Sequence, residues 1–273
     1  MSASWLDPAW SPPPPARATV VFVHGAIVRG WEMALLRRRL RQLGYRVRQF
    51  RYRSMMKGLD DNARRLSTFL QETDGDVLHV IGHSMGGVLV RQVFERQPDP
   101  RPGRLIAIGS PLLDCWVGRR ISRMHRRIGP CLVGRTVADH ISRPSDPVWR
   151  GSRDFGVLAG TYRFGIGAIF SSLPRPSDGV VLLAETRLQG IRDHVTFRLN
   201  HFGMLFSTRC CAQVACFLAT GAFAHAMAGE PMAAADSRAE VVALLDPKGS
   251  LPVSDIRRPM GAPREPSSPR LTG

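Results

Sequence analysis

The sequence predicts an α/β protein with a mostly parallel sheet of about six strands flanked by helices, and with an inserted cap. Three observations support this prediction. Short apolar runs rich in β-branched residues alternate with longer segments of helical periodicity. The 273 residues, 44% of them hydrophobic, suit one globular domain with appendages. A long Arg-rich segment between the fourth and fifth predicted strands exceeds a simple connection and predicts the cap.

Each predicted strand is a short run of apolar residues, or of apolar residues alternating with polar ones. The first run is continuous and β-branched, which is typical of a buried strand, and it ends at His24-Gly25. The six predicted strands are Ala18–Val23, Tyr45–Tyr52, Asp76–Ile81, Arg104–Ile108, Phe155–Gly160 and His194–Leu199. Because predicted helices lie between several of these strands, we expect βαβ units and parallel neighbours.

The predicted helices carry apolar residues three or four positions apart. In the first helix Leu36, Leu40 and Leu43 share one face. Asp60 or Asp61 supplies an N-cap for the second. The predicted helices are Trp31–Leu43, the segment after Asp60 or Asp61, Met85–Gln97 and Gly203–Leu218, the last ended by Gly221.

The chain divides into a main domain and two appendages. Residues 1–17 hold five prolines and form an N-terminal extension, and residues 18–221 form the main domain. The cap occupies about 111–151 within that domain. Residues 222–273 are rich in Pro, Ala, Ser and Arg, which predicts a largely disordered tail with one short helix near Ala239–Leu245.

The charge balance is strongly basic, with 38 Lys and Arg against 22 Asp and Glu and a net charge of +16. Such a balance fits nucleic acid, an anionic membrane surface or an acidic substrate. The arginines are spread along the chain rather than clustered. This distribution favours a general bias of the composition toward arginine as the origin of the charge. Nucleic acid is the least supported partner, because no recognised motif occurs and aromatic residues make up only 7%.

Cysteine usage and the lack of long apolar runs indicate the compartment. Five cysteines with no Cys-x-x-Cys pair do not form a disulfide framework or a zinc site. Cys210, Cys211 and Cys216 lie in an apolar helical stretch and are expected as buried reduced thiols. No run of about 20 apolar residues occurs, and the Pro-rich start lacks the apolar core of a signal peptide. We therefore expect a cytoplasmic protein.

The most informative motif is Gly82-His83-Ser84-Met85-Gly86-Gly87. It follows a predicted buried strand and opens a predicted helix, which is the context that a nucleophile elbow requires. At such a bend the Ser84 hydroxyl is raised above the sheet edge on a strained backbone, and Gly82 and Gly86 avoid collisions. A phosphate-binding turn is the alternative, but it requires a Gly-x-Gly-x-x-Gly spacing that this motif does not supply.

Together these features resemble the α/β-hydrolase superfamily, and most of all its small bacterial lipases and esterases. The resemblance rests on His24-Gly25 after the first strand, the elbow, Ser177-Asp178-Gly179 and His201. It covers residues 18–221 and is weak in the cap. It implies a minimal α/β-hydrolase fold, without the additional amino-terminal strands of larger members.

The resemblance also implies a catalytic triad in the order Ser, acid, His. Ser84 is then the nucleophile, and His201, just after the last predicted strand, is the base that takes its proton. Asp178 is the acid that holds the imidazole tautomer, with Asp114 after the fourth strand as the alternative acid. His83, inside the elbow, is expected to point away from the direction of Ser84.

Acyl transfer further needs two backbone N–H groups aimed at the developing oxyanion. The resemblance implies Met85, directly after the nucleophile, as one donor. It implies Ala26, in the turn that His24 and Gly25 shape, as the other. No metal or organic cofactor is expected for this chemistry.

The implied activity is hydrolysis of carboxylic esters, of the esterase or lipase type, through an acyl-enzyme. A thioesterase, amidase or acyltransferase on the same triad is one alternative, and a non-catalytic module that binds lipid or protein is another. The substrate is expected to be a small-molecule or lipid ester, selected by the cap with Ile27, Val28 and Phe202.

A predicted cap helix over residues 116–128 has an apolar face, formed by Trp116, Val117, Ile121, Met124 and Ile128, and a basic face. Either it packs its apolar face on the cleft, or it makes peripheral contact with an anionic membrane.

Overall fold

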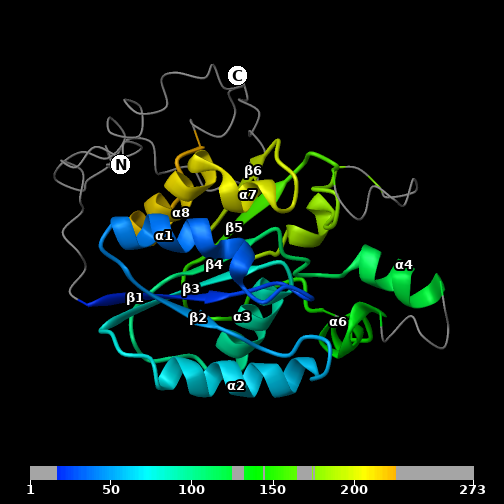
Figure 1. Cartoon of the computed structure of the whole chain (residues 1–273), viewed down its shortest axis with the longest axis horizontal. Helices are drawn as coiled ribbons and strands as arrows, with labels where there is room; N and C mark the ends of the chain where they lie inside the picture. The colour runs from blue at the N-terminus through cyan, green and yellow to red at the C-terminus, as the bar shows by residue number, and fades with distance from the viewer. Residues whose placement is uncertain (1–16, 125–131, 144, 165–173, 175, 226–273) are drawn as a thin grey trace, which may run out of the picture.

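The computed structural model describes residues 17–124, 132–143, 145–164, 174 and 176–225. Within these ranges, helices on both sides enclose a central sheet (Figure 1). The predicted extension before Arg17, the predicted helix near Ala239–Leu245 and Ile128 of the predicted cap helix lie outside the described residues.

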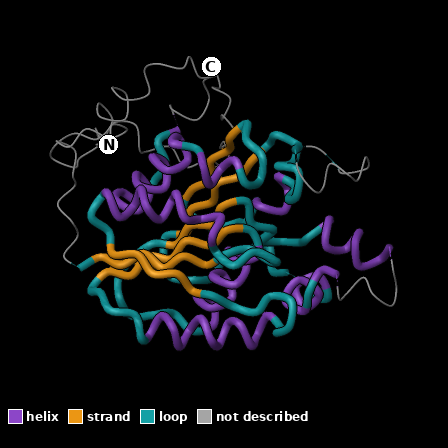
Figure 2. The backbone as a smooth tube through the Cα atoms, viewed as in Figure 1, coloured by secondary structure: helices purple, strands orange, loops and turns teal. Residues whose placement is uncertain are grey.

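The central sheet has six parallel strands in the order β2-β1-β3-β4-β5-β6 (Figure 2). The strands are β1 Ala18–Val23, β2 Arg46–Phe50, β3 Val77–His83, β4 Leu105–Ile108, β5 Phe155–Gly160 and β6 Asp193–Phe197. The predicted fold class is confirmed. The strand order reverses between β1 and β3, and open α/β sheets commonly bind ligands at the carboxyl ends of the strands at such a point.

Helices cover both faces of the sheet because the side chains of each strand alternate between them. One face carries η1 (Trp31–Met33), α1 (Ala34–Gln42), α7 (Gly203–Phe206) and α8 (Thr208–Thr220). The other carries α2 (Leu59–Gln71), α3 (Met85–Arg96) and α6 (Arg135–Ile141). Along β1, Val20 and Phe22 pack with α1 and α8, whereas Val21 and Val23 pack with α2 and α3.

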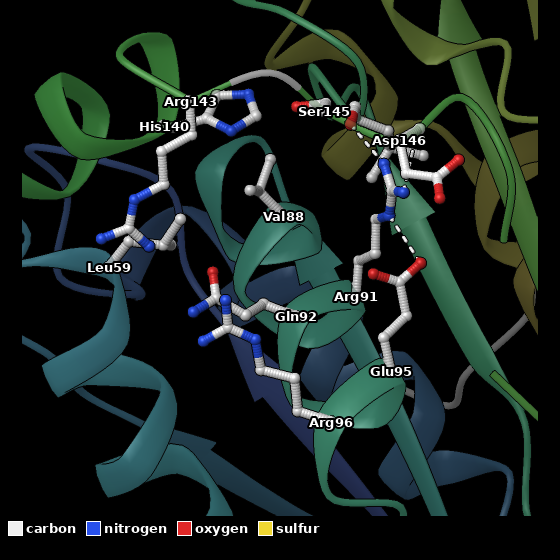
Figure 3. A pocket seen from close by; sticks show the side chains of 11 residues that line it. Leu59, Val88, Arg91, Gln92, Glu95, Arg96, His140, Arg143, Ser145 and Asp146 are labelled. Carbon is white, nitrogen blue, oxygen red and sulfur yellow. Dashed lines mark hydrogen bonds and ion pairs between the residues drawn. The ribbon is translucent and has the colours of Figure 1, made fainter. Parts of the chain in front are cut away.

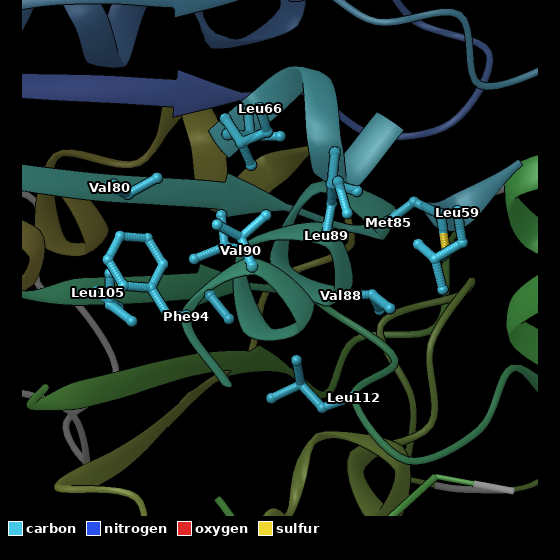
Figure 4. Packing of buried hydrophobic residues seen from close by; sticks show 14 of the residues in the cluster. Leu59, Leu66, Val80, Met85, Val88, Leu89, Val90, Phe94, Leu105 and Leu112 are labelled. Carbon is cyan, nitrogen blue, oxygen red and sulfur yellow. The ribbon is translucent and has the colours of Figure 1, made fainter. Parts of the chain in front are cut away.

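The core on the α2–α3 side holds α3 against the sheet (Figure 4). Leu89 and Phe94 of α3 pack with Leu66 of α2 and with Val80 and Leu105 of the strands, and none of the five is more than 2% exposed. Burial of side chains of this size contributes about 1.5–3 kcal/mol each. The helix that begins directly after the elbow is therefore firmly fixed.

The start of α2 differs from the prediction. The helix begins at Leu59 with Gly58 as its N-cap, so Asp60 and Asp61 lie in the first turn instead of at the cap. The prediction of an Asp N-cap is wrong because Asp60 uses its carboxylate in ion pairs with two arginines. Its charge still lies near the amino end of the helix, where it is favourable.

The last predicted helix is two helices. Ser207 has an extended backbone, with ψ of 132°, and its Oγ accepts a hydrogen bond from the N–H of Cys210. The side chain thereby caps α8 and separates it from α7. Gly221, with φ of 84°, ends α8 as predicted.

The predicted cap holds α4 (Trp116–Met124) and α6. These two helices pack closely, since a side-chain carbon at Gly118 would lie 2.9 Å from Val137. The carboxylate of Asp139 accepts a hydrogen bond from the N–H of Leu59 at 3.0 Å, which joins the cap to α2.

The described cysteines are free and buried; they are Cys115, Cys210, Cys211 and Cys216. The three in α8 therefore lie as predicted. No helix in the described ranges has both the length and the apolar character needed to cross a membrane.

Candidate active site

The bend between β3 and α3 has the strained backbone that the motif predicts. Ser84 has φ of 53° and ψ of −126°, a conformation that costs a non-glycine residue roughly 1–3 kcal/mol. The neighbouring glycines make the bend possible, because a side chain at Gly82 would collide with the backbone of Gly86 and Gly87. One at Gly86 would collide with the carbonyl of Val23. The bend therefore sits directly against the end of β1.

His201 and Asp178 meet at the same edge of the sheet. The Nδ1 atom of His201 lies 2.7 Å from Oδ2 of Asp178, and both side chains are buried. The other carboxylate oxygen accepts hydrogen bonds from the N–H groups of Val180 and Val181, at 2.8 and 2.7 Å. Three donors thus hold Asp178, and the carboxylate fixes the proton of His201 on Nδ1, leaving Nε2 free to accept a proton.

Contacts of neighbouring residues place the bend at Ser84 near this pair. The His83 ring, directly before Ser84, lies 4.7 Å from the His201 ring between centroids. A side-chain carbon at Gly109, after β4, would lie 3.0 Å from Asp178 and 3.1 Å from His201. Among the described residues no hydrogen bond joins the Ser84 hydroxyl to His201. In free enzymes this contact is often long and tightens when substrate binds.

The turn after β1 is held by His24. Its Nδ1 donates to the carbonyl of Gly25 at 2.7 Å, and its Nε2 accepts from the N–H of Tyr52 at 3.2 Å. Both partners are backbone groups, so the ring is neutral with its proton on Nδ1. Burial lowers the pKa of His24, which favours this neutral form.

This ring orients the turn for which an oxyanion donor is predicted. The carbonyl of Gly25 points at His24, so the N–H of Ala26, on the other side of the same trans peptide, points away from that ring. A side-chain carbon at Gly25 would lie 3.0 Å from Cβ of Ser84. Ile27 next has φ of 70°, a strained conformation for a β-branched residue. Met85 supplies the other predicted donor, at the first position of α3.

His83 lies differently from the prediction. Its ring does not point away from the site, but packs against His201 and against Phe202, 5.7 Å away between centroids. It is 1% exposed, and neither ring nitrogen has a hydrogen-bond partner among the described residues. Burial, followed by the nearby His201, holds its pKa well below the usual range. The direction of the Ser84 side chain does not fix that of its neighbour, and no signal in the sequence gives the orientation of the His83 ring.

The alternative acid has other partners. Oδ1 of Asp114 accepts from Nε of Arg119 at 2.6 Å and from the N–H of Cys115 at 2.7 Å. Its carboxylate thus stabilises the start of α4. Only Asp178, of these two candidates, contacts His201.

A separate cavity of about 150 Å³ lies beside α3, between α2 and α6 (Figure 3). Its charged lining is largely paired: Arg91 binds Glu95 at 2.9 Å, and Arg96 and Arg143 each bind Asp60 at 2.8 Å. Asp146, which also lines the cavity, binds Arg150 at 2.7 Å, so the charged side chains of the described lining all have partners. In the described part of the chain, no group of three or more His, Cys, Asp and Glu residues is arranged to hold a metal ion.

Comparison with known families decides the assignment of the fold. Residues 20–264 match the sequence profile described as the alpha/beta hydrolase family. The chain belongs to this family. A search of curated proteins finds no match.

Solved structures with the same fold include lipases and esterases. Lipase BlEst2 from Bacillus licheniformis has a TM-score of 0.55 and 17% identity, covering 70% of this chain and 87% of its own. The metagenomic carboxyl esterase MGS0156 has a TM-score of 0.55 and 16% identity, and the match covers 68% of this chain and 65% of the esterase chain. Phospholipase PlaB from Legionella pneumophila has a TM-score of 0.58 and 19% identity, and the match covers 84% of this chain and 62% of the phospholipase chain. The α/β-hydrolase chain thus spans less than two thirds of the last two, and at these identities all three show the fold alone.

Proposed function

We propose that this α/β-hydrolase cleaves carboxylic esters through Ser84, His201 and Asp178. The observation that carries the proposal is the 2.7 Å contact between buried His201 and Asp178, at the sheet edge where strained Ser84 begins α3. A serine hydroxyl becomes a useful nucleophile only when a base takes its proton. A neutral imidazole with its proton fixed on Nδ1 has the form that a base requires.

The proposed reaction proceeds in two halves. Ser84 Oγ attacks the ester carbonyl carbon while Nε2 of His201 takes the hydroxyl proton, and the carbonyl oxygen becomes an oxyanion. The N–H groups of Ala26 and Met85 are the proposed donors to that oxyanion. The intermediate collapses, the bond to the alcohol breaks, and the imidazolium returns its proton to the leaving oxygen. Water then attacks the acyl-enzyme with His201 again as base, which releases the acid and restores Ser84.

Asp178 acts through His201 in this scheme. Its carboxylate stabilises the imidazolium that forms after proton transfer and keeps the ring in one orientation. The hydrogen bonds from Val180 and Val181 hold the carboxylate itself in place. No cofactor enters the proposed chemistry.

An ester with an apolar acyl group is the proposed substrate class. Two apolar side chains next to the proposed reacting groups are exposed, Ile27 at 66% and Phe202 at 37%, and would contact such a chain. The similar structures named above include a lipase, a carboxyl esterase and a phospholipase. The proposed compartment is the cytoplasm, which the free buried cysteines support.

Labelling with a fluorophosphonate tests the serine chemistry directly. We expect the wild type to be labelled at Ser84 and the Ser84→Ala variant to be unlabelled. Ser122→Ala in α4 is the matched control and should be labelled like the wild type. Lack of labelling in the wild type would contradict the proposal and favour a non-catalytic binding module. A panel of ester, thioester and amide substrates of one acyl chain then tests the preference for esters.

A further inference from the structure

The large exposed hydrophobic side chains of the described residues gather at one edge of the sheet. Every one of them lies on a segment that follows the carboxyl end of a strand. They are Ile27 and Trp31 after β1, Met55 and Met56 after β2, Leu132 in the cap after β4, Tyr162 and Phe164 after β5, and Phe202 and Phe206 after β6. We call these side chains the apolar rim. Scattered single exposed hydrophobics need no explanation, but such a one-sided distribution does.

Contacts place the apolar rim around the proposed reacting groups. Phe202 follows His201 directly, and its ring lies 5.4 Å from the His201 ring between centroids. The backbone of Phe164 lies against Gly179, next to Asp178, because a side-chain carbon at Gly179 would meet it at 2.6 Å. Phe202 and Phe164 of the rim therefore lie next to the proposed reacting groups.

The cap is joined to the same rim. The N–H of Arg135 donates to the carbonyl of Met55 at 3.1 Å, and a side-chain carbon at Gly134 would lie 2.8 Å from Sδ of Met55. Leu132, two positions before Gly134, is thereby held near the segment after β2. The segments after β2 and β4 thus meet at this edge.

The same edge is rich in positive charge. Exposed basic side chains on these segments are Arg29, Arg51, Arg53, Lys57, Arg120, Arg123 and Arg135. The acidic side chains on them are buried or hydrogen-bonded; they are Glu32, Asp60, Asp61, Asp114, Asp139, Asp146, Asp178 and Glu185. Among the described residues the exposed carboxylates are Glu72, Asp74, Asp76 and Asp146, and the first three lie at the opposite edge, between α2 and β3. Charge and apolar surface therefore coincide at one edge.

The cap helix α4 takes part through its charges and not through its apolar face. Val117 is 6% exposed, and Ile121 packs against the core, so the apolar side of α4 is turned inward. Arg120 and Arg123 are exposed. Val117 and Ile121 pack on the core, and the loops of the rim supply the exposed hydrophobic side chains.

We infer that the carboxyl edge of the sheet docks on an anionic lipid surface through the apolar rim and the basic side chains around it. Apolar side chains that enter the interface combine with cations that face anionic headgroups, and together they give stable peripheral binding. Docking in this orientation would present Ser84 to esters held in the lipid. The presentation of substrate rests on the proposed function, whereas the docking itself requires no hydrolysis.

Vesicle binding tests the docking with the full chain carrying Ser84→Ala, so that no substrate is consumed. Sedimentation with phosphatidylcholine vesicles is compared with sedimentation with vesicles that are one-third phosphatidylglycerol. We expect binding to the anionic vesicles that weakens steeply with salt, and much weaker binding to the neutral vesicles. Equal binding to both, or no binding to either, would overturn the inference.

Substitutions locate the docking face, since a protein of net charge +16 could attach through any basic surface. Trp31→Ser with Met56→Ser should weaken binding by roughly tenfold or more, because two exposed apolar side chains are removed. Arg53→Gln with Lys57→Gln should weaken it by roughly 25-fold, or about fivefold for each charge. The matched control is Arg41→Gln with Arg46→Gln, which removes two exposed charges at the other edge and should change binding little.

A control pair that weakens binding as much as the rim pairs would overturn the proposed orientation. Undiminished binding after the Trp31 and Met56 substitutions would mean attraction by charge alone, and would also overturn it. Thermal melting of each variant checks the fold. Quenching of tryptophan fluorescence by brominated lipid adds a direct readout. It is measured for the Ser84→Ala chain with Trp31 and for the same chain with Trp31→Phe. We expect the quenched part of the signal to be smaller in the second chain, because Trp31 should contribute to it. Loss of fluorophosphonate labelling would contradict the proposed function without affecting these results.

Discussion

The two edges of the sheet differ in how completely their buried polar groups are paired. At the amino edge, Arg101 and Arg153 share the carboxylate of Asp99, and their remaining N–H groups bind backbone carbonyls. Arg153 donates to the carbonyl of Leu78 at 2.6 Å, and Arg101 to that of Leu70 at 2.6 Å. The charges are paired and their hydrogen bonds are made, which is what burial of an ion pair requires.

The carboxyl edge holds the strain and the unpaired groups. Of the three described non-glycine residues with positive φ, Ile27 and Ser84 lie here. Glu32 and His83 are buried here with polar atoms that have no hydrogen-bond partner in the described part of the chain. Strain and unpaired groups lower stability, so their presence at the carboxyl edge is consistent with the chemistry proposed there, whereas the paired charges of the amino edge favour stability. Substitutions at the two edges test this division.

The largest expected effect is that of Ser84→Ala. If Ser84 is the nucleophile, kcat for ester hydrolysis should fall by roughly 10⁴- to 10⁶-fold. Stability should hardly change, because the side chain of the half-buried residue is shortened by one oxygen only. Ser84→Gly should lose the same activity and also raise the free energy of unfolding by about 1 kcal/mol, because glycine adopts the positive φ without strain.

Initial rates on a soluble model ester and denaturant melts check these expectations. A Ser84→Gly variant that is less stable than the wild type would contradict the strain that we assign to the elbow.

The next effect separates the two candidate acids. Asp178→Asn should lower kcat by roughly 10³- to 10⁴-fold with little change in KM, because the amide no longer holds His201 in the right tautomer. Asp114→Asn is the matched control and should keep kcat within a factor of a few, since its contacts are with Arg119 and Cys115. The same rate measurements decide it. Equal losses in the two variants would remove the distinction between a catalytic and a structural carboxylate.

Substitution at the amino edge should have the reverse profile. Asp99→Ala leaves two arginines without their shared partner and should lower the free energy of unfolding by about 3 kcal/mol. The activity of the molecules that remain folded should stay unchanged. Burial alone would raise the pKa of Asp99, but hydrogen bonds from Arg101 and the charge of Arg153 outweigh it and lower that pKa.

The contribution of Asp99 is therefore present above the unfolded pKa and is lost as pH falls through the lower folded value. Urea melts at neutral pH and at pH below 4 check both parts. A loss of activity without a loss of stability in Asp99→Ala would contradict the division between the edges.

The strands and the elbow were predictable because each depends on local chemistry. The continuous apolar run of β1 and the glycines around Ser84 carry their own conformational requirements. The resemblance to the α/β-hydrolases also indicated Asp178 and His201. Their contact depends on loops whose course no periodicity encodes.

The errors have a common physical cause, which is competition by distant partners. Asp60 failed as an N-cap because arginines from other elements bind its carboxylate. The final helix was broken by the hydroxyl of Ser207, which caps a new helix more favourably than it continues the old one. The His83 ring turned toward His201, a residue 118 positions away in sequence. Local patterns do not report such tertiary contacts.

The smallest expected effect concerns Glu185, which links the cap to the loop carrying Asp178. Its carboxylate accepts hydrogen bonds from the N–H groups of Trp116, at the start of α4, and of Leu182, at 2.5 and 2.8 Å. Burial raises the pKa of Glu185 to about 7, although these two hydrogen bonds oppose the rise. The folded protein therefore binds a proton that the unfolded chain releases near pH 4.5.

The stability that Glu185 contributes is thus fully present below pH 4.5 and is lost as the pH rises through about 7. The loss amounts to at most about 3 kcal/mol. In Glu185→Gln this pH dependence of the free energy of unfolding should disappear. The variant lacks one hydrogen bond, so it should be less stable than the wild type at pH 5. By pH 8 the difference in stability between the two proteins should be smaller. Glu72→Gln, at an exposed position, is the control and should follow the wild type at both values. Urea melts at pH 5 and pH 8 measure the effect. An equal change of stability with pH in the wild type and in Glu185→Gln would contradict the prediction. It would mean that the carboxylate remains ionised in the folded protein because its two N–H donors outweigh burial.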